Sequence, residues 1–325
     1  MDTLSFAIQA MAPLLLLGAL GYLLKHKGHL PKSYIDALNR FVFTIALPVL
    51  IFTTISSVES FALLKWDVVA FALVMITLII ASGYLALIPM KIKEKQKPVL
   101  HQAFHRGNFV LIGIPLAMRL GGENALQIIV IFNAFMLPIT NAVSILTFQL
   151  WGEDKRFTKA DVGRLAKGTI LNPIMLATLL GLLSFALKPV WSGVNETLPM
   201  IEETLEMLAA TATPLALIAI GGQFDLGRIG TFKRPLLIGV LARNIIVPAF
   251  VFISALFMVG RIDFTHTWSS MIAIFASPVA IASVAVAKGM DHDDELASQI
   301  VVWTTLLSIV PLFVLIVIFR ALGYL

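Results

Sequence analysis

Long apolar stretches alternate along the chain with short polar connections that hold most of its charged residues. A helix that crosses a bilayer needs about 20 mostly apolar residues, and the stretches approach or exceed that length. The connections are too short to form a soluble domain, so we expect one membrane domain over residues 1–325. The pattern predicts ten transmembrane helices, at residues 5–24, 36–57, 67–89, 99–119, 124–151, 168–187, 203–223, 234–258, 267–288 and 294–320.

Composition supports the same class. Of the 325 residues, 58% are hydrophobic and 13% are charged, whereas soluble domains have about 45–50% apolar and about 25% charged residues. The net charge of +5 comes from basic residues spread over short runs, which excludes a nucleic-acid-binding face and predicts membrane lipid as the surrounding partner. The chain has no cysteine, which excludes disulfides and thiolate sites.

Lysine and arginine concentrate in the odd-numbered connections, and such connections face the cytoplasm in multi-pass proteins. We therefore predict a multi-pass protein of the cell membrane with both termini outside the cytoplasm. We interpret an acidic run before the last span as a solvated loop, with a metal site as the alternative; it comprises Asp291, Asp293, Asp294 and Glu295. In the third connection we count Lys91, Lys93, Lys95, Lys97 and Arg106.

Prolines recur in the same order in the two halves of the chain. Five spans in each half place the halves in opposite orientations, and such inverted repeats are typical of secondary transporters. We predict one repeat at residues 1–152 and the other at residues 165–325. The matched prolines are Pro13 with Pro173, Pro48 with Pro214, and Pro115 with Pro278.

Two of these prolines predict helices that are broken inside the membrane. Gly113-Ile114-Pro115 should unwind span four near mid-membrane, and Ser277 before Pro278 should cap the second half of span nine. The N-terminus of a half-helix carries a partial positive charge and free N–H groups, which suit a carboxylate. A simple proline kink without a ligand is the alternative for each break.

Polar residues within the spans are few, and no Asp or Glu lies near the middle of one. Asn108 lies about two helical turns before the proline of span four, and Asn133 is another amide that we assign to the pocket. We weigh two interpretations of Arg243 equally: it attracts an anion, or its side chain reaches to the membrane–water interface. His101 and His105 share a helix face, so metal binding is a further alternative there.

The chain resembles the auxin efflux carrier family, which includes the plant PIN-type auxin exporters and bacterial carriers for dicarboxylates such as malate or malonate. The resemblance implies ten helices in two inverted five-helix repeats, with spans four and nine crossing at their breaks. It also implies a scaffold part, a moving transport part, and a homodimer. The residues that carry it are Asn39-Arg40-Phe41-Val42, Leu47-Pro48, Asn108 with Gly113-Ile114-Pro115, Asn172-Pro173 with Gly181, and Ser277-Pro278.

In the plant members an asparagine at the position of Asn108 contacts the carboxylate, and the resemblance implies that role for Asn108. The plant members have a polar residue where this chain has Ile51, and a long loop between the halves where this chain has a short one. These departures speak against auxin itself and favour the bacterial branch of the family.

We therefore predict an all-α integral membrane protein that moves small organic anions by alternating access and is not an enzyme. The anions are mono- or dicarboxylates such as malate, malonate or auxin-like acids. We expect no cofactor and no bound metal, and leave the coupling ion open between a proton and sodium. A sodium-coupled symporter of the bile-acid type is the alternative within transport. The predicted site comprises Asn108, Gly113, Ile114, Pro115, Asn133, Ser277 and Pro278.

Overall fold

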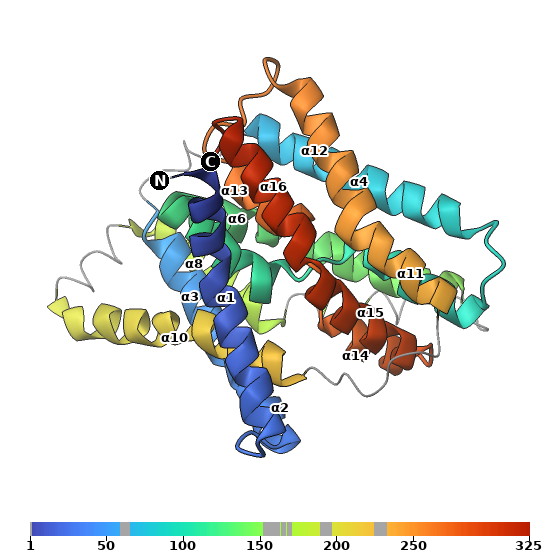
Figure 1. The fold of residues 1–325 in the computed structure, drawn as a ribbon. Helices are drawn as coiled ribbons and strands as arrows, with labels where there is room; N and C mark the ends of the chain where they lie inside the picture. Colours follow the sequence, from blue (N-terminus) through green and yellow to red (C-terminus); the bar gives the residue numbers. More distant parts are fainter. Residues whose placement is uncertain are drawn as a thin grey trace.

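The fold is a bundle of helices in which the two chain termini lie close together (Figure 1). A computed structural model describes residues 2–58, 66–151, 171–188, 197–223 and 233–325, together with residues 163 and 167. In these residues the regular elements are helices, and β pairing is limited to two isolated bridges. Near the termini the guanidinium of Arg320 lies 4.4 Å from the centre of the Phe6 ring.

The first part of the chain runs from α1 to α6. Its elements are α1 (Thr3–His26), α2 (Lys32–Phe41), η1 (Val42–Ala46), α3 (Leu47–Ser56), α4 (Trp66–Leu87), η3 (Glu94–Gln96), α5 (Lys97–His105), η4 (Phe109–Gly113) and α6 (Ile114–Leu150). The later part comprises α8 (Pro173–Ala186), α10 (Pro199–Gln223), α11 (Lys233–Leu241), η6 (Ala242–Ile246), α12 (Val247–Met258), α13 (Trp268–Phe275), α14 (Ala282–Gly289), α15 (Asp294–Leu307) and α16 (Ile309–Ala321).

Six of the described helices are long and apolar enough to cross a membrane, or seven if α15 and α16, bent by 42°, form one span. The other predicted spans correspond to helices that are short or interrupted. Gly122 has φ +62° and ψ −151° inside α6, so α6 covers both the end of predicted span four and the whole of span five. The helices α5 and α13 have nine and eight residues, and each is followed by a break.

Three π-helical turns each end just before a proline. The turns are η1, η4 and η6, and the prolines are Pro48, Pro115 and Pro248, each the second residue of the α-helix that follows. A proline removes one N–H donor and its ring clashes with the carbonyl four residues earlier. Widening the preceding turn to a π-helix removes that clash without ending the helix.

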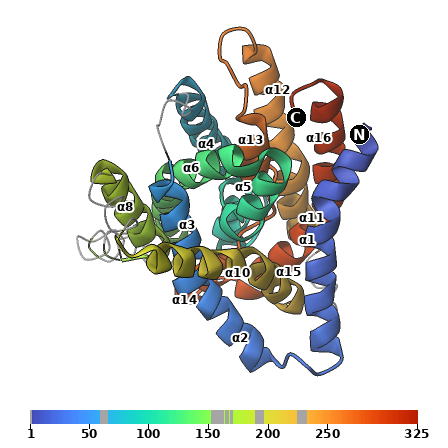
Figure 2. The same ribbon diagram turned by 90° about the vertical axis from the view of Figure 1, so that its left-hand side faces the viewer.

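The most buried helices are α5 and α13. Every residue of α5 and of α13 is buried, and α5 lies in the middle of the bundle in Figure 2. Large apolar side chains are exposed instead on surrounding helices, as at Leu16 of α1, Leu85 of α4 and Phe257 of α12. Apolar exposure on this scale is expected of helices that face lipid.

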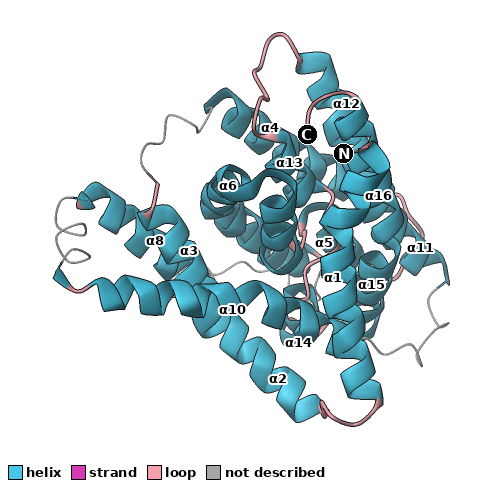
Figure 3. Cartoon of the chain, turned by 60° about the vertical axis from the view of Figure 1, so that its left-hand side comes forward, coloured by secondary structure: helices cyan, strands magenta, loops and turns pink. Residues whose placement is uncertain are grey.

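A second group of helices packs around α10. α10 lies against α1, α2 and α3, and α3 packs in turn against α8 (Figure 3). Glycines bring the backbones of α1 and α10 into contact: a Cβ atom added at Gly221 would overlap the carbonyl oxygen of Gly18, and one at Gly21 would overlap that of Ile218. Small residues at such crossings are typical of helix pairs in membranes, where close packing drives association.

Replacing Gly221 with valine should lower the melting temperature of the detergent-purified protein, measured by circular dichroism. The new side chain meets backbone rather than a movable side chain, and overpacking of this kind costs about 1–3 kcal/mol. Gly18→Ala is the matched control, because a Cβ atom at Gly18 meets nothing within 4 Å. Equal melting temperatures for the two variants would contradict the packing described here.

Candidate functional site

The chain leaves helical structure after α5 and again after α13, and the two breaks lie against each other. Gly107 and Val279 form an antiparallel bridge. The backbone N–H of Asn108 donates to the carbonyl of Pro278 (2.6 Å), and that of Ala280 donates to the carbonyl of Arg106 (2.9 Å). We call residues 106–108 together with residues 277–280 the crossing. The breaks in predicted spans four and nine therefore meet in space.

The position predicted for the first break is wrong. Gly113, Ile114 and Pro115 are helical, and the break lies instead at Arg106 (ψ 80°) to Asn108 (ψ 53°). The π-helical turn η4 accommodates Pro115, so the proline does not unwind the helix. Gly113 serves close packing: a Cβ atom there would lie 2.7 Å from the carbonyl oxygen of Ala273 in α13.

The role predicted for Ser277 is also wrong. Ser277 is fully buried, and its hydroxyl donates to the carbonyl of Ile274 (3.2 Å) at the end of α13. The following helix, α14, begins only at Ala282. The last carbonyls of a helix lack partners within the helix, so Ser277 completes the end of α13 rather than the start of α14. Pro278 lies in the extended strand of the crossing.

Asn108 occupies the start of the half-helix that follows the first break. Its side-chain oxygen accepts a hydrogen bond from the backbone N–H of Leu111 (3.3 Å), as an N-cap residue does. Asn108 is only 3% exposed, and its amide nitrogen Nδ2 has no hydrogen-bond partner. A buried donor without a partner is costly, so Asn108 presents a free N–H₂ group beside the crossing.

Asn133 is the second amide predicted for the site. It lies on α6 beyond Gly122, is 2% exposed, and has no hydrogen-bond partner for either side-chain polar atom. No hydrogen bond joins it to Asn108 among the described residues. Ile114 and Pro115 are buried at the start of α6. The structure thus brings Asn108, Ser277 and Pro278 together at the crossing and leaves Asn133 as a separate unpaired amide.

Arg243 in η6 holds the crossing together. Its Nε donates to the carbonyl of Ser277 (2.6 Å) and its Nη2 to that of Ile274 (3.0 Å), both at the end of α13. Its Nη1 donates to the carbonyl of Phe104 (3.3 Å), near the end of α5. The side chain is 2% exposed, so it neither reaches the interface nor is free to attract an anion.

The partial charges at the two helix ends explain why a buried arginine is stable there. The C-terminus of a helix carries about half a negative charge, and Arg243 contacts the C-termini of both α5 and α13. Among the described residues no carboxylate forms an ion pair with it. Gly107 is required beside it, because a Cβ atom there would overlap the Nη2 atom of Arg243.

The sequence assignment of Arg106 to a cytoplasmic loop is wrong. Arg106 is 8% exposed and follows α5 directly, inside the crossing. Its Nη2 donates to the side-chain oxygen of Asn141 in α6 (2.9 Å), and its Nη1 has no partner. The place of Arg106 within the apolar stretch 99–119 indicates a position inside a span. That signal outweighs the basic residues that precede the stretch.

Residues of α15 complete the hydrogen bonding of the second break. The hydroxyl of Thr304 accepts from the backbone N–H of Val279 (3.2 Å). The carbonyl of Thr304 accepts from the side chain of Asn244 (3.0 Å), which is the neighbour of Arg243. The sequence analysis did not identify Thr304, because one threonine in an apolar helix gives no signal of its own.

His101 and His105 lie in contact on α5, with ring centres 4.7 Å apart. His101 Nε2 lies 2.9 Å from the carbonyl oxygen of Ile80, and His105 Nε2 lies 3.2 Å from the hydroxyl of Ser144. Within the described part of the chain, no group of three or more His, Asp or Glu residues is placed to hold a metal ion. The pair is therefore bonded to α4 and α6, and nothing in its surroundings supports metal binding.

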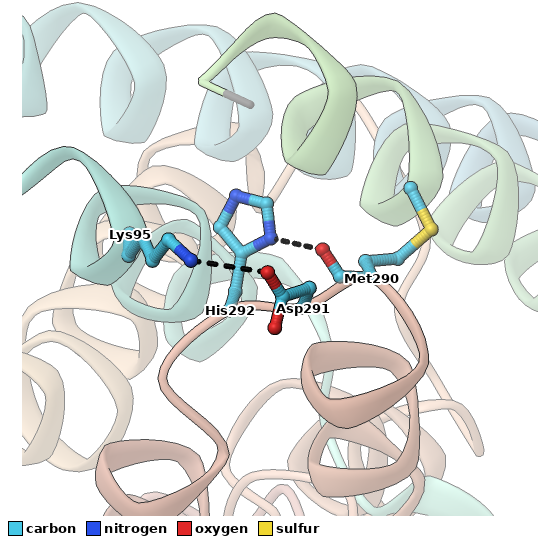
Figure 4. A network of polar contacts seen from close by, with 4 residues as sticks. All are labelled: Lys95, Met290, Asp291 and His292. Carbon is cyan, nitrogen blue, oxygen red and sulfur yellow. Dashed lines mark hydrogen bonds and ion pairs between the residues drawn. The ribbon is translucent and has the colours of Figure 1, made fainter. Parts of the chain in front are cut away.

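The acidic run before α15 is tied to the connection before α5 (Figure 4). The carboxylate of Asp291 lies 3.1 Å from the ammonium of Lys95, and that of Asp293 accepts from the side chain of Gln96 (2.9 Å). His292 is turned back onto its own loop, with Nδ1 2.6 Å from the carbonyl oxygen of Met290. These contacts link the starts of α5 and α15. The side chain of Asp291 is 99% exposed, so the run is a solvated connection, as predicted.

Comparison with known proteins gives one result that covers nearly the whole chain. A family described as membrane transport protein matches residues 6–316. No curated protein matches the chain.

Replacing Arg243 with glutamine should lower thermal stability strongly, because the carbonyls of α5 and α13 lose their cation. Hydrogen bonds to charged groups contribute about 1.5–3 kcal/mol each, and several are lost together. The melting temperature of the purified protein in detergent measures the effect. Arg243→Lys keeps the charge, so its melting temperature should lie between those of Arg243→Gln and the parent protein. Arg234→Gln is the control, since Arg234 is exposed at the start of the same segment.

A melting temperature of Arg243→Gln equal to that of Arg234→Gln would contradict the role of Arg243 in the crossing.

Proposed function

The chain belongs to the membrane transport protein family, the family of the auxin efflux carriers, and from that membership we propose that it moves small organic anions by alternating access. The observation that carries the proposal is the side chain of Asn108, a buried amide with a free N–H₂ group beside the crossing. The match covers residues 6–316, so the transporter assignment applies to the chain as a whole rather than to one segment.

The charges around the crossing support an anion as the substrate. Asn108 caps the N-terminus of η4, where the free N–H groups and the positive end of the helix dipole lie. Arg106 adds a positive charge, and no described carboxylate forms an ion pair with it, whereas the charge of Arg243 is already met by the two helix ends. A small carboxylate would supply the missing negative charge and an acceptor for the Asn108 amide.

We propose that the chain crosses the membrane ten times, in two inverted repeats of five. Span four would comprise α5, η4 and the start of α6, and span five the part of α6 after Gly122. Span nine would comprise α13 and α14, and span ten α15 and α16. The similar form of spans four and nine supports the repeat: each starts with a short, wholly buried helix and continues through an extended break.

We further propose that the helices around α10 form the scaffold, against which the helices that carry the crossing move. The backbone contact between α1 and α10, and the packing of α3 on α8, support a firm scaffold. The hydrogen bonds that join the crossing to η6 and to α15, and the one that joins η6 to α5, support its movement as one unit. An anion held by Asn108 would then be carried with that unit.

The setting of the carrier follows from the distribution of basic residues and from the family resemblance. We propose a multi-pass protein of the cell membrane with both termini outside the cytoplasm, and the neighbouring termini in Figure 1 fit an even number of spans. We propose a homodimer on the resemblance alone. The function is transport rather than catalysis, because the family is one of transport proteins.

Replacing Asn108 with alanine should reduce the uptake of labelled malonate into proteoliposomes by about tenfold or more. Removing a hydrogen-bond donor to a charged group costs about 1.5–3 kcal/mol, and each 1.4 kcal/mol corresponds to a factor of ten. Asn124→Ala is the matched control, an exposed asparagine in α6. Uptake by Asn108→Ala equal to that of the control, or no carboxylate uptake by the parent protein, would contradict the proposal.

Arg243 argues against the sodium-coupled alternative. Carbonyl groups at the ends of two half-helices are the kind of oxygen ligands that a sodium ion would need, and here the guanidinium already contacts them. A second cation at the same carbonyls would face the charge of Arg243 at close range.

Uptake of malonate should therefore be unchanged when sodium is replaced by choline on both sides of the proteoliposome membrane. The measurement is the initial rate at matched ionic strength, with a control for the internal volume of the vesicles. A drop of tenfold or more without sodium would favour the symporter and contradict this assignment of Arg243.

A further inference from the structure

We infer that Arg106 is a specificity-determining residue that binds a second acidic group of the substrate, through its Nη1 atom, while Asn141 holds its Nη2 atom. The inference rests on the proposed transport of organic anions and narrows it. Anions with two acidic groups should bind much more tightly than matched anions with one. The observations that support it concern the burial, pairing and position of Arg106.

Arg106 is a buried cation whose hydrogen bonding is incomplete. The residue is 8% exposed, and the only partner of its guanidinium head is the neutral side-chain oxygen of Asn141, 2.9 Å from Nη2, within the described residues. Nη1 is buried and has no partner. A charged group in the membrane interior is normally paired, so the unpaired face of Arg106 is an open position for an anion.

Arg243, also buried, has a hydrogen-bond partner for each of its guanidinium nitrogens, so the two arginines differ in how completely they are bonded. Arg243 donates from all three of its guanidinium nitrogens, to carbonyls near the ends of α5 and α13. Arg106 also follows α5, yet its side chain forms no hydrogen bond to a carbonyl of that helix. The partial negative charge at the end of α5 is met by Arg243, so Arg106 is not needed there as a helix cap.

Arg106 and Asn108 lie close together in the chain, which suits a small anion with two acidic groups. Only Gly107 lies between them, so their Cα atoms lie within about 7 Å. Both side chains have free N–H donors, Nη1 in Arg106 and Nδ2 in Asn108. A short dicarboxylate, with its two acidic groups a few bonds apart, has the length to meet both donors. Arginine suits this role because its planar fork matches a carboxylate.

Asn141 is a positioning residue in this arrangement. It lies on α6, about two helical turns beyond Asn133, and is half-buried. Its side-chain oxygen accepts from Nη2 without bringing a negative charge. A carboxylate at the same position would pair with Arg106 inside the protein and compete with the substrate. The neutral amide therefore orients the guanidinium and leaves its charge available.

The test compares succinate with butyrate, which have the same number of carbon atoms but differ in one carboxylate. The full-length protein is reconstituted in proteoliposomes, and the apparent affinity for each anion is measured by its own labelled uptake. The variants are Arg106→Gln, which removes the charge, and Asn141→Asp, which keeps Arg106 and supplies a competing carboxylate. Arg119→Gln is the matched control, an exposed arginine on the same predicted span.

We expect the parent protein and Arg119→Gln to bind succinate about 30-fold or more tightly than butyrate, the range that one buried charge contact gives. Both Arg106→Gln and Asn141→Asp should lose that preference, to within about threefold, and keep their affinity for butyrate. If Arg106 had only a structural role, Arg106→Gln would instead lose affinity for both anions equally. That result, or a preference that survives in both variants, overturns the inference.

The same measurements separate this inference from the proposed function. If the parent protein carries neither anion, the transport proposal fails before any variant is examined. If it carries both without preference, anion transport stands and the role of Arg106 is wrong. If Arg106→Gln does not fold, Asn141→Asp decides the question, because it retains the arginine.

Discussion

A helix that is interrupted inside a bilayer must find partners for the backbone groups that the interruption frees, because lipid offers none. The crossing meets this constraint with two interruptions that satisfy each other. The N–H groups of Asn108 and Ala280 donate across it, the N–H of Val279 donates to Thr304, and Arg243 supplies donors to the remaining carbonyls of both helix ends. Each break therefore satisfies backbone groups of the other, and η6 and α15 satisfy further ones.

This solution also separates the charges of the interior. The C-termini of α5 and α13 are neutralised by Arg243, a cation that belongs to the chain and cannot leave it. Asn108 caps the start of η4, the segment that follows α5, and its amide nitrogen keeps a free donor. The unpaired donor at the start of η4 is the feature that supports our proposal of an anion as the substrate.

The sequence predicted the apolar helices and the existence of two breaks, but not where the first break lies. Pro115 marks a position where an α-helix cannot continue unchanged, and a π-helical turn accommodates it locally. The break occurs at Gly107 because only a residue without a Cβ atom fits against Arg243. That requirement arises from a residue 136 positions away in the sequence, so no local pattern reveals it. Arg106 was missed for a related reason: it was counted with the lysines that precede α5, whereas its side chain bonds to Asn141 of α6.

The two buried arginines differ in how the fold meets their charge: Arg243 is fully paired, and for the partly paired Arg106 we propose a role in recognition. Removing a charge from water is costly unless the protein replaces the lost interactions. For Arg243 the helix ends replace them permanently. For Arg106 the neutral Asn141 replaces only part of them, so the proposed anion would supply an interaction that the fold leaves unmade. A carrier needs such a site, because binding must be favourable enough to capture the substrate while the empty site remains intact after release.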